Sequence, residues 1–215
     1  MDTRIADLRK EYTQSELDES SVLSQPIEQF ERWFQEALSA ELPEPNAMHL
    51  STADAEGRPS GRMVLIKGIE AGGILFFTNY ESRKGQQLAA NPYAALTFFW
   101  PELERQVRIE GRVEKTSAER SEAYFRTRPK GSRIGAWSSP QSKVIAGRRE
   151  LEQHLNQYHD QFADKDDIPL PSFWGGYLLQ PSRFEFWQGR PNRLHDRIEY
   201  LEQPNGAWQI QRLAP

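Results

Sequence analysis

The sequence predicts an α+β fold in which mainly antiparallel strands form a barrel and a few helices are inserted between them. Several segments of strand length are apolar or alternate between apolar and polar residues, and turn-forming residues such as Asp54 to Pro59 separate them. The helical patterns are too few and too irregularly placed for a doubly wound parallel sheet. At 215 residues the chain has the length of one domain with a sizeable core.

The first predicted element is a helix that begins at Pro26, because proline suits the first turn of a helix. Strands are predicted next over 48–53, 62–67 and 73–78, arranged as an antiparallel meander. The apolar residues of the helix share one face, which assigns it to the scaffold: Ile27, Phe30, Phe34, Ala37 and Leu38.

The rest of the chain continues this mixture of helices and strands. A helix over 82–91 is closed by Pro92. Another over 117–126 ends before Arg128, because the residue that precedes a proline avoids the helical region. The other predicted elements are strands over 94–100 and 105–115, a loop over 131–140, a helix over 147–162, an acidic linker over 164–167 and C-terminal strands.

Composition excludes several classes of function. The net charge of -4 disfavours general nucleic-acid binding, which depends on clustered positive charge. No apolar run is long enough to span a bilayer and the N-terminus lacks an apolar signal core, so we expect no membrane partner and a cytoplasmic location. Without cysteine there is no thiol chemistry, and four scattered histidines do not indicate a metal site.

Common cofactor and catalytic motifs are absent from the sequence. There is no G-x-G-x-x-G after a strand, no P-loop, no H-E-x-x-H and no G-x-S-x-G. If a nucleotide-like cofactor binds, side chains must therefore hold its phosphate.

Residues 193–197 read Arg-Leu-His-Asp-Arg. If they form a strand, its period of two places Arg193, His195 and Arg197 side by side on one face. With the aromatic residues of 184–187 nearby, this face suits a flat, phosphorylated ligand. The alternative is an ordinary solvated face of an antiparallel sheet.

Two further segments are candidates for binding a phosphate. Ser82 is predicted to cap a helix whose first turn contains Arg83 and Lys84, where cations are unfavourable unless an anion joins them. The alternative is that both side chains point into water. In the apolar strand over 62–67, Arg62 and Lys67 point to opposite faces and would serve different groups, or simply be the solvated ends of a buried strand.

A third candidate is the set Tyr124, Arg128 and Ser132, spaced by four. A phenol, a guanidinium and a hydroxyl together suit a phosphate, although residues at a helix end are often simply exposed. Gln106 and the pair at 141–142 are weaker candidates that offer donors and acceptors to a heterocycle.

Taken together, these segments closely resemble the pyridoxamine 5′-phosphate oxidase family, FMN enzymes that make pyridoxal 5′-phosphate. The resemblance extends from about Leu8 to Pro215. One departure is Phe77, where many relatives have tyrosine. The resemblance rests on the segments 8–12, 62–67, 77–79, 82–84, 104–107, 135–137, 169–176, 186–189 and 193–197.

The resemblance implies a split β-barrel flanked by helices, and a homodimer with two FMN molecules at the subunit interface. It divides the chain into a mobile N-terminal segment, 1–25, and a single domain, 26–215, that includes the C-terminal dimerisation and active-site strands. It assigns FMN contacts to Arg62, Met63, Val64, Leu65, Ile66, Lys67, Phe77, Thr78, Arg83, Lys84, Gln106, Gln141, Ser142, Trp187 and Arg197.

The resemblance also implies the substrate site. Arg193 and His195 lie against the pyridine ring near its reacting carbon, which makes them the catalytic candidates. Arg9 and Tyr12 belong to the segment that covers the substrate. The substrate phosphate is assigned to Lys67, Tyr124, Arg128 and Ser132.

The implied reaction moves a hydride equivalent from pyridoxamine or pyridoxine 5′-phosphate to FMN, which O2 then reoxidises with formation of hydrogen peroxide. The alternatives are a non-catalytic FMN or pyridoxal phosphate binding module on the same barrel, since a fold can persist without its activity, or a related flavin reductase.

Overall fold

The computed structural model describes residues 10–215. The chain divides into two compact units. The first unit comprises Met1–His49, of which 10–49 are described, together with Ala95–Glu110 and Pro181–Pro215. The second unit comprises Leu50–Ala94 and Gly111–Gln180. The expected boundary at residue 25 and the expected single domain over 26–215 stay predictions.

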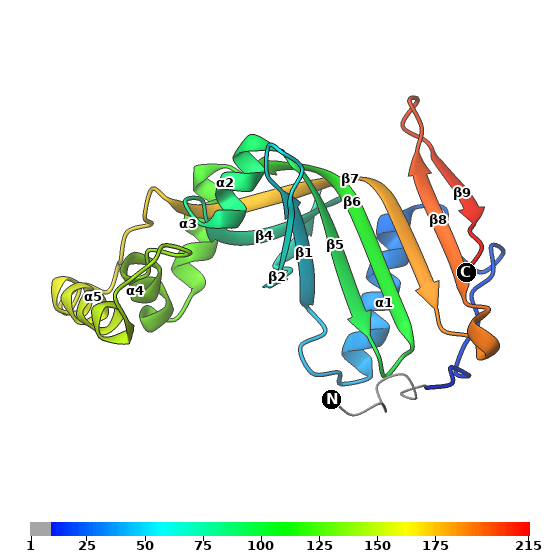
Figure 1. The fold of residues 1–215 in the computed structure, drawn as a ribbon, viewed down its shortest axis with the longest axis horizontal. Helices are drawn as coiled ribbons and strands as arrows, with labels where there is room; N and C mark the ends of the chain where they lie inside the picture. The colour runs from blue at the N-terminus through cyan, green and yellow to red at the C-terminus, as the bar shows by residue number, and fades with distance from the viewer. Residues whose placement is uncertain (1–9) are drawn as a thin grey trace. The chain divides into compact units, whose positions relative to one another are not determined.

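The structure confirms an α+β fold with antiparallel strand pairs (Figure 1). Hydrogen bonds order the strands β2-β1-β5-β6-β7-β4-β3, and β8 pairs with β7 and β9. Within 10–215 no helix is long and apolar enough to cross a membrane. The elements are α1 (Pro26–Ser39), β1 (Ala47–Ala53), β2 (Pro59–Leu65), β3 (Gly68–Glu70), β4 (Gly73–Asn79), α2 (Arg83–Ala90), β5 (Tyr93–Trp100), β6 (Arg105–Lys115), α3 (Ala118–Thr127), α4 (Lys130–Ser138), α5 (Arg148–Gln161), β7 (Trp174–Gln188), the 3₁₀ turn η2 (Pro191–Arg193), β8 (Asp196–Glu202) and β9 (Trp208–Arg212).

In the first unit, α1 packs its aromatic residues against the sheet. The Phe30 ring lies 5.0 Å from Phe98 of β5, and the Trp33 ring lies 5.3 Å from Phe186 of β7. The helix that begins at Pro26 is thus confirmed, but its buried face differs from the prediction, since Leu38 is 44% exposed. Trp33, which was not included in the predicted face, is buried instead, because its ring packs against Phe186 of β7.

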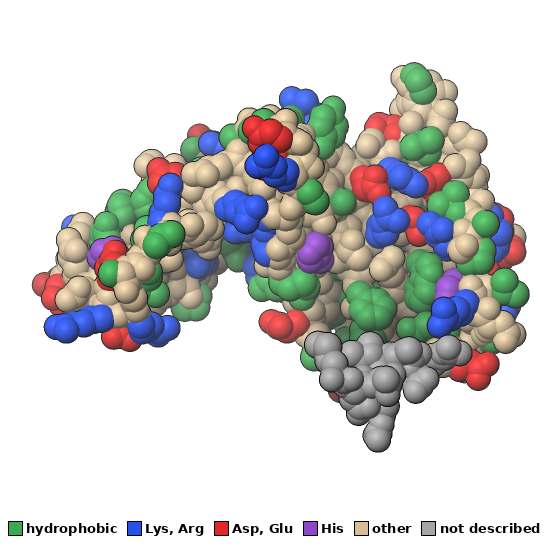
Figure 2. Space-filling model, in the orientation of Figure 1, with side chains coloured by type: hydrophobic (Ala, Val, Ile, Leu, Met, Phe, Trp, Pro, Cys, Tyr) green, Lys and Arg blue, Asp and Glu red, His purple; other side chains and the backbone are tan. Residues whose placement is uncertain are grey.

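Charged residues of β6, β7 and β8 form ion pairs on one face of the first unit. The Glu185 carboxylate accepts two hydrogen bonds of 3.0 Å from Arg197 and one of 3.1 Å from Arg108. Glu199 is opposite Glu185 in the register of β7 and β8, and it pairs with Arg183. Acidic and basic side chains alternate over this part of the surface in Figure 2. These arginines therefore balance carboxylates that are themselves buried.

In the second unit, β4 pairs with β3 on one edge and with the first half of β7 on the other. In the predicted meander, the pairing of the first two strands is confirmed, since β1 and β2 are neighbours, but the predicted pairing of the second strand with the third is wrong, since β4 is not next to β2. Ala71 and Gly72 have φ of 47° and 77°, so they reverse the chain tightly into a β3–β4 hairpin that the sequence pattern did not reveal. The other edge of β4 is then free for β7, with Phe77 opposite Gly176.

The predicted loop over 131–140 is also wrong, because these residues contain most of helix α4. Ile134 is buried in a cluster with Phe125 of α3 and Trp174 of β7. This packing stabilises a helix whose own sequence contains two glycines and has weak intrinsic propensity.

Gly85 in the first turn of α2 lies tightly against the backbone of Tyr80. A Cβ at this position would lie 2.1 Å from the carbonyl oxygen of Tyr80, so the backbone would have to move. Gly85→Ala is expected to lower the free energy of unfolding by about 1 to 3 kcal/mol. Gly131→Ala, in the first turn of α4 with open space around it, is the control and should be neutral or stabilising by about 0.4 to 1 kcal/mol. Equal effects in urea unfolding would contradict the tight contact.

Candidate functional site

A pocket of about 690 Å³ opens in the second unit. Its walls come from β2, β4, α2, α3, α4 and the loop after α4, and this volume suits a cofactor-sized ligand. The predicted site residues that line it are Met63, Val64, Leu65, Lys67, Phe77, Thr78, Lys84, Tyr124, Arg128, Ser132 and Gln141.

Three stacked aromatic rings form one wall of the pocket. The Tyr124 ring lies 4.0 Å from Phe77 with an interplanar angle of 20°, and Phe77 lies 5.6 Å from Trp174 at 12°. Trp174 belongs to the segment 169–176, which resembles the family, but the sequence pattern does not predict a role for it. Trp174 is far from Tyr124 in the chain, so the sequence spacing does not predict that the two rings lie together.

Arg128 lies at the C-terminal end of α3 with extended backbone, as expected for a residue before proline. Its guanidinium carbon lies 4.7 Å from the centre of the Trp174 ring. Burial lowers its pKa, and its Nη1 is buried without a hydrogen-bond partner among residues 10–215. A buried guanidinium nitrogen that lacks an acceptor at the wall of a pocket is suited to an anionic ligand.

Ser132 lies in the first turn of α4 and Tyr124 in α3. The four-residue spacing of Tyr124, Arg128 and Ser132 does not follow one helix, because Pro129 separates α3 from α4. The structure nevertheless brings all three to the pocket, together with Lys67 from the segment after β2.

Lys84 is at the centre of a second set of polar residues in the pocket. Its ammonium donates to Thr78 Oγ1 at 3.2 Å and to Gln141 Oε1 at 3.0 Å. Ser82 caps α2 as predicted, since its side chain accepts from the N–H of Gly85. Lys84 therefore occupies the first turn of α2, close to the positive end of the helix dipole.

Positive charge gathers around this end of α2. Burial and the charge of Arg83 lower the pKa of Arg62, and burial and the charge of Arg62 lower the pKa of Lys84. Arg62 donates to Leu50 O, Thr52 Oγ1 and Ser60 Oγ. No carboxylate of residues 10–215 contributes to either shift, so an anion would relieve the repulsion between these cations.

Some predicted positions of the second unit do not line the pocket. Arg62 and Arg83 lie beside Lys84 as described, and Ile66 is buried. Ser142 has a φ of 69° and is exposed in the loop after α4.

The remaining predicted site residues belong to the first unit, apart from Arg9, which lies outside the described residues. The rings of Tyr12, Trp187 and His195 form a cluster: Trp187 lies 4.7 Å from His195, and Tyr12 lies 5.6 Å from Trp187 and 5.8 Å from His195. Gln106 lies in β6, and the guanidinium of Arg197 is bound by Glu185.

The strand predicted over 193–197 is wrong for its first three residues. Arg193 ends the turn η2, and β8 begins only at Asp196. Asn192 and Arg193 have φ of 55° and 62°, a left-handed conformation that interrupts any strand. Arg193 and His195 therefore lie in a turn, and only Arg197 is on the strand.

The hydrogen bonding of His195 favours its neutral form. Its Nδ1 accepts from the backbone N–H of Arg190 at 3.1 Å, which places the proton of the neutral ring on Nε2. Burial and the charge of Arg193 lower its pKa, against the opposing effect of Asp196. Both the hydrogen bond and the lowered pKa favour the neutral ring, with its proton on Nε2.

Comparison with protein families gives two matches. A model described as pyridoxamine 5′-phosphate oxidase matches residues 34–162, and one described as the pyridoxine 5′-phosphate oxidase C-terminal dimerisation region matches residues 174–215. Relatives named pyridoxine/pyridoxamine 5′-phosphate oxidase occur in Cupriavidus taiwanensis, 59% identical over 213 residues, and in Salinibacter ruber, 55% identical over 214 residues. Both alignments cover 99% of this chain and 100% of the relative.

Two solved structures are similar to this chain. PhzG from Burkholderia lata 383, solved in complex with tetrahydrophenazine-1-carboxylic acid, has a TM-score of 0.85 at 30% identity, covering 91% of this chain and 95% of that one. A pyridoxamine 5′-phosphate oxidase-related, FMN-binding protein from Nostoc punctiforme PCC 73102 has a TM-score of 0.67 at 18% identity, covering 86% and 97%. The second likeness supports the fold alone.

Proposed function

Since the chain belongs to the pyridoxamine 5′-phosphate oxidase family, we propose that it is an FMN-dependent oxidase that converts pyridoxamine or pyridoxine 5′-phosphate to pyridoxal 5′-phosphate. One observation carries the proposal most directly. The cations around the pocket fall into two groups, one near α2 and one at the end of α3, as expected for a cofactor and a substrate that each carry a phosphate.

In this proposal, the group near α2 holds the FMN phosphate. Arg62, Arg83 and Lys84 provide the charge, and the capped N-terminus of α2 adds its dipole. The crowding of these cations fits a dianionic ligand, because its binding would offset their mutual repulsion. Thr78 and Gln141, already in contact with Lys84, provide further hydrogen-bonding groups.

The group at the end of α3 holds the substrate phosphate. Lys67 and Arg128 supply charge, Tyr124 and Ser132 supply hydroxyl donors, and Arg128 Nη1 has no protein partner in the described chain. Charge-assisted hydrogen bonds of this kind contribute about 1.5 to 3 kcal/mol each before desolvation costs.

FMN held by Arg62, Arg83 and Lys84 would supply the redox chemistry, namely oxidation of the substrate carbon that bears the amine or alcohol by two electrons and reduction of O2 to hydrogen peroxide. The task of the chain is then to place that carbon at reacting distance and exclude water. We assign the orientation of the pyridine ring to Arg193 and His195, with His195 donating through Nε2.

We further infer a homodimer with active sites at the subunit interface. The match to the dimerisation region, 174–215, supports this inference. That region includes Trp187, Arg193, His195 and Arg197, so the residues assigned to the cofactor and the pyridine ring lie in the part of the chain expected to meet a second subunit.

The pH dependence of turnover tests the neutral state of His195. Its lowered pKa means that the folded protein disfavours protonation, so the neutral ring persists as the pH falls through 6.5. We expect kcat to be constant above about pH 7 and to decrease only below the ordinary histidine range. In His195→Asn, kcat should be lower throughout and this acid limb should disappear. A kcat that rises as the pH falls through 6.5 would show instead that the protonated ring is active.

A substrate comparison tests the proposed function. The purified protein with FMN should form pyridoxal 5′-phosphate and hydrogen peroxide from pyridoxamine 5′-phosphate, with far weaker turnover of pyridoxamine, which lacks the phosphate. Binding without turnover would indicate the non-catalytic module. Oxidation of a reduced nicotinamide alone would indicate a flavin reductase. Preferential oxidation of tetrahydrophenazine-1-carboxylic acid, the compound bound in the PhzG structure, would indicate a different substrate.

A further inference from the structure

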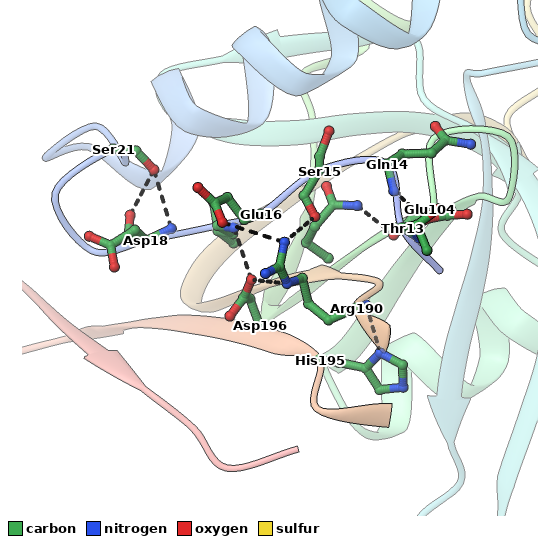
Figure 3. Close-up of polar contacts among 12 residues, drawn as sticks. Thr13, Gln14, Ser15, Glu16, Asp18, Ser21, Glu104, Arg190, His195 and Asp196 are labelled. Atoms are coloured by element: carbon green, nitrogen blue, oxygen red, sulfur yellow. Dashed lines mark hydrogen bonds and ion pairs between the residues drawn. The ribbon is translucent and has the colours of Figure 1, made fainter. Parts of the chain in front are cut away.

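The segment 12–19 lies along the turn 189–196, which carries Arg193 and His195 (Figure 3). One end of this contact is at Glu104, a buried carboxylate. Its Oε2 accepts the backbone N–H groups of Thr13 at 2.8 Å and Gln14 at 3.1 Å, while its carbonyl oxygen accepts the N–H of Gly189 at 2.7 Å. A single residue thus holds both the segment and the start of the turn.

The other end of the contact is at Asp196. Its Oδ2 accepts the backbone N–H of Leu17 at 3.0 Å, and its Oδ1 accepts from Arg212 Nη1 at 2.8 Å. Arg190 Nε lies 3.5 Å from the same carboxylate. Arg212 also donates to the carbonyl oxygen of Leu17, so both polar groups of the Leu17 backbone are held.

Arg190 connects this carboxylate to the histidine. Its Nη1 donates to the carbonyl oxygen of Ser15 at 3.2 Å, and its backbone N–H donates to His195 Nδ1 at 3.1 Å. The side chain of Arg190 therefore contacts both the segment and Asp196, and the backbone of the same residue orients the His195 ring (Figure 3).

The turn itself has an unfavourable backbone. Asn192 and Arg193 both have positive φ, a left-handed conformation that asparagine tolerates but that is unfavourable for arginine and persists there only where the surroundings enforce it. The segment is part of those surroundings, since the Tyr12 ring covers Gly189 so closely that a Cβ there would lie 2.6 Å from Tyr12 Cγ.

We propose that Asp196 is a positioning residue: its carboxylate joins the segment 12–19 to the turn, so that Arg193 and His195 reach their working geometry only when the segment is in place. Without the carboxylate, the N–H of Leu17 loses its acceptor and Arg190 and Arg212 lose a shared counter-ion. The catalytic consequence rests on the function proposed above, whereas the coupling of segment and turn does not.

Hydrogen exchange tests the coupling without any activity measurement. In Asp196→Ala, which leaves no acceptor at this position, peptides covering 13–19 and 189–195 should both exchange at least about fivefold faster, because the N–H of Leu17 loses its acceptor and the turn loses the contact between Asp196 and Arg190. Glu19→Ala is the matched control. It removes another partner of Arg212 that has no contact with the turn, and it should leave the 189–195 peptide unchanged.

Turnover then tests the positioning role. Asp196→Ala should lower kcat by about tenfold or more, since a displacement near 1 Å can cost up to about 100-fold, with FMN content unchanged and Glu19→Ala at the wild-type rate. Faster exchange in 13–19 alone, or unchanged exchange in both peptides, would overturn the coupling. A normal kcat despite faster exchange in both would overturn the positioning role, and an inactive wild type would contradict the proposed function instead.

Discussion

Replacing Arg128 with alanine is expected to raise the Michaelis constant for pyridoxamine 5′-phosphate by roughly 10- to 150-fold, the equivalent of about 1.5 to 3 kcal/mol for a lost charge-assisted hydrogen bond. The guanidinium borders the pocket, and its Nη1 has no acceptor within the described chain, so the phosphate would supply one. The phosphate contact should stabilise the bound substrate and the transition state equally. Its loss should therefore change kcat much less than the Michaelis constant.

Arg126→Ala is the matched control for this experiment. Arg126 lies two residues away on α3, exposed and paired with Glu122 at 2.7 Å. Its loss should leave the kinetics unchanged, since exposed pairs of this kind contribute less than about 1 kcal/mol even to stability. A wild-type Michaelis constant in Arg128→Ala, with FMN bound and the melting temperature retained, would remove Arg128 from the substrate phosphate site.

Replacing Lys84 with methionine is expected to raise the dissociation constant for FMN by roughly 10- to 150-fold, again from the loss of about 1.5 to 3 kcal/mol. Methionine keeps much of the apolar stem and removes the ammonium at the capped end of α2. Riboflavin, which lacks the phosphate, should bind wild type and variant alike, so the ratio of the two dissociation constants isolates the phosphate contact.

The control for Lys84→Met is Lys165→Met, in an exposed part of the acidic linker. Flavin fluorescence titrations should give wild-type constants for both ligands in this variant. An equal loss of FMN and riboflavin binding in Lys84→Met would place Lys84 at the ring system or in the scaffold, rather than at the phosphate.

The parts of the site that are local in sequence were predictable. Ser82, Arg83 and Lys84 belong to one helix start, where cap chemistry and the helix dipole already indicate an anion. The extended backbone of Arg128 follows from the proline after it. These features depend only on residues that are neighbours in the chain, so they can be predicted without knowledge of the tertiary structure.

The parts that depend on long-range contacts were not predictable. The left-handed residues Asn192 and Arg193 are held by a turn that contacts Tyr12 and Leu17, at the opposite end of the chain. An alternating sequence gives no sign of this, and its period of two indicated a strand. The prediction of a loop in place of helix α4 was wrong for a related reason. The burial of Ile134 stabilises this helix and outweighs the weak helix propensity of its sequence.

The anaerobic half-reaction tests the central claim most directly. Pyridoxine 5′-phosphate is added without oxygen to the purified, FMN-loaded protein, the visible flavin band is followed, and air is then admitted. The proposed oxidase predicts bleaching by the substrate, followed by recovery of the band with formation of pyridoxal 5′-phosphate and hydrogen peroxide. A flavin that remains oxidised while the substrate is demonstrably bound would contradict it.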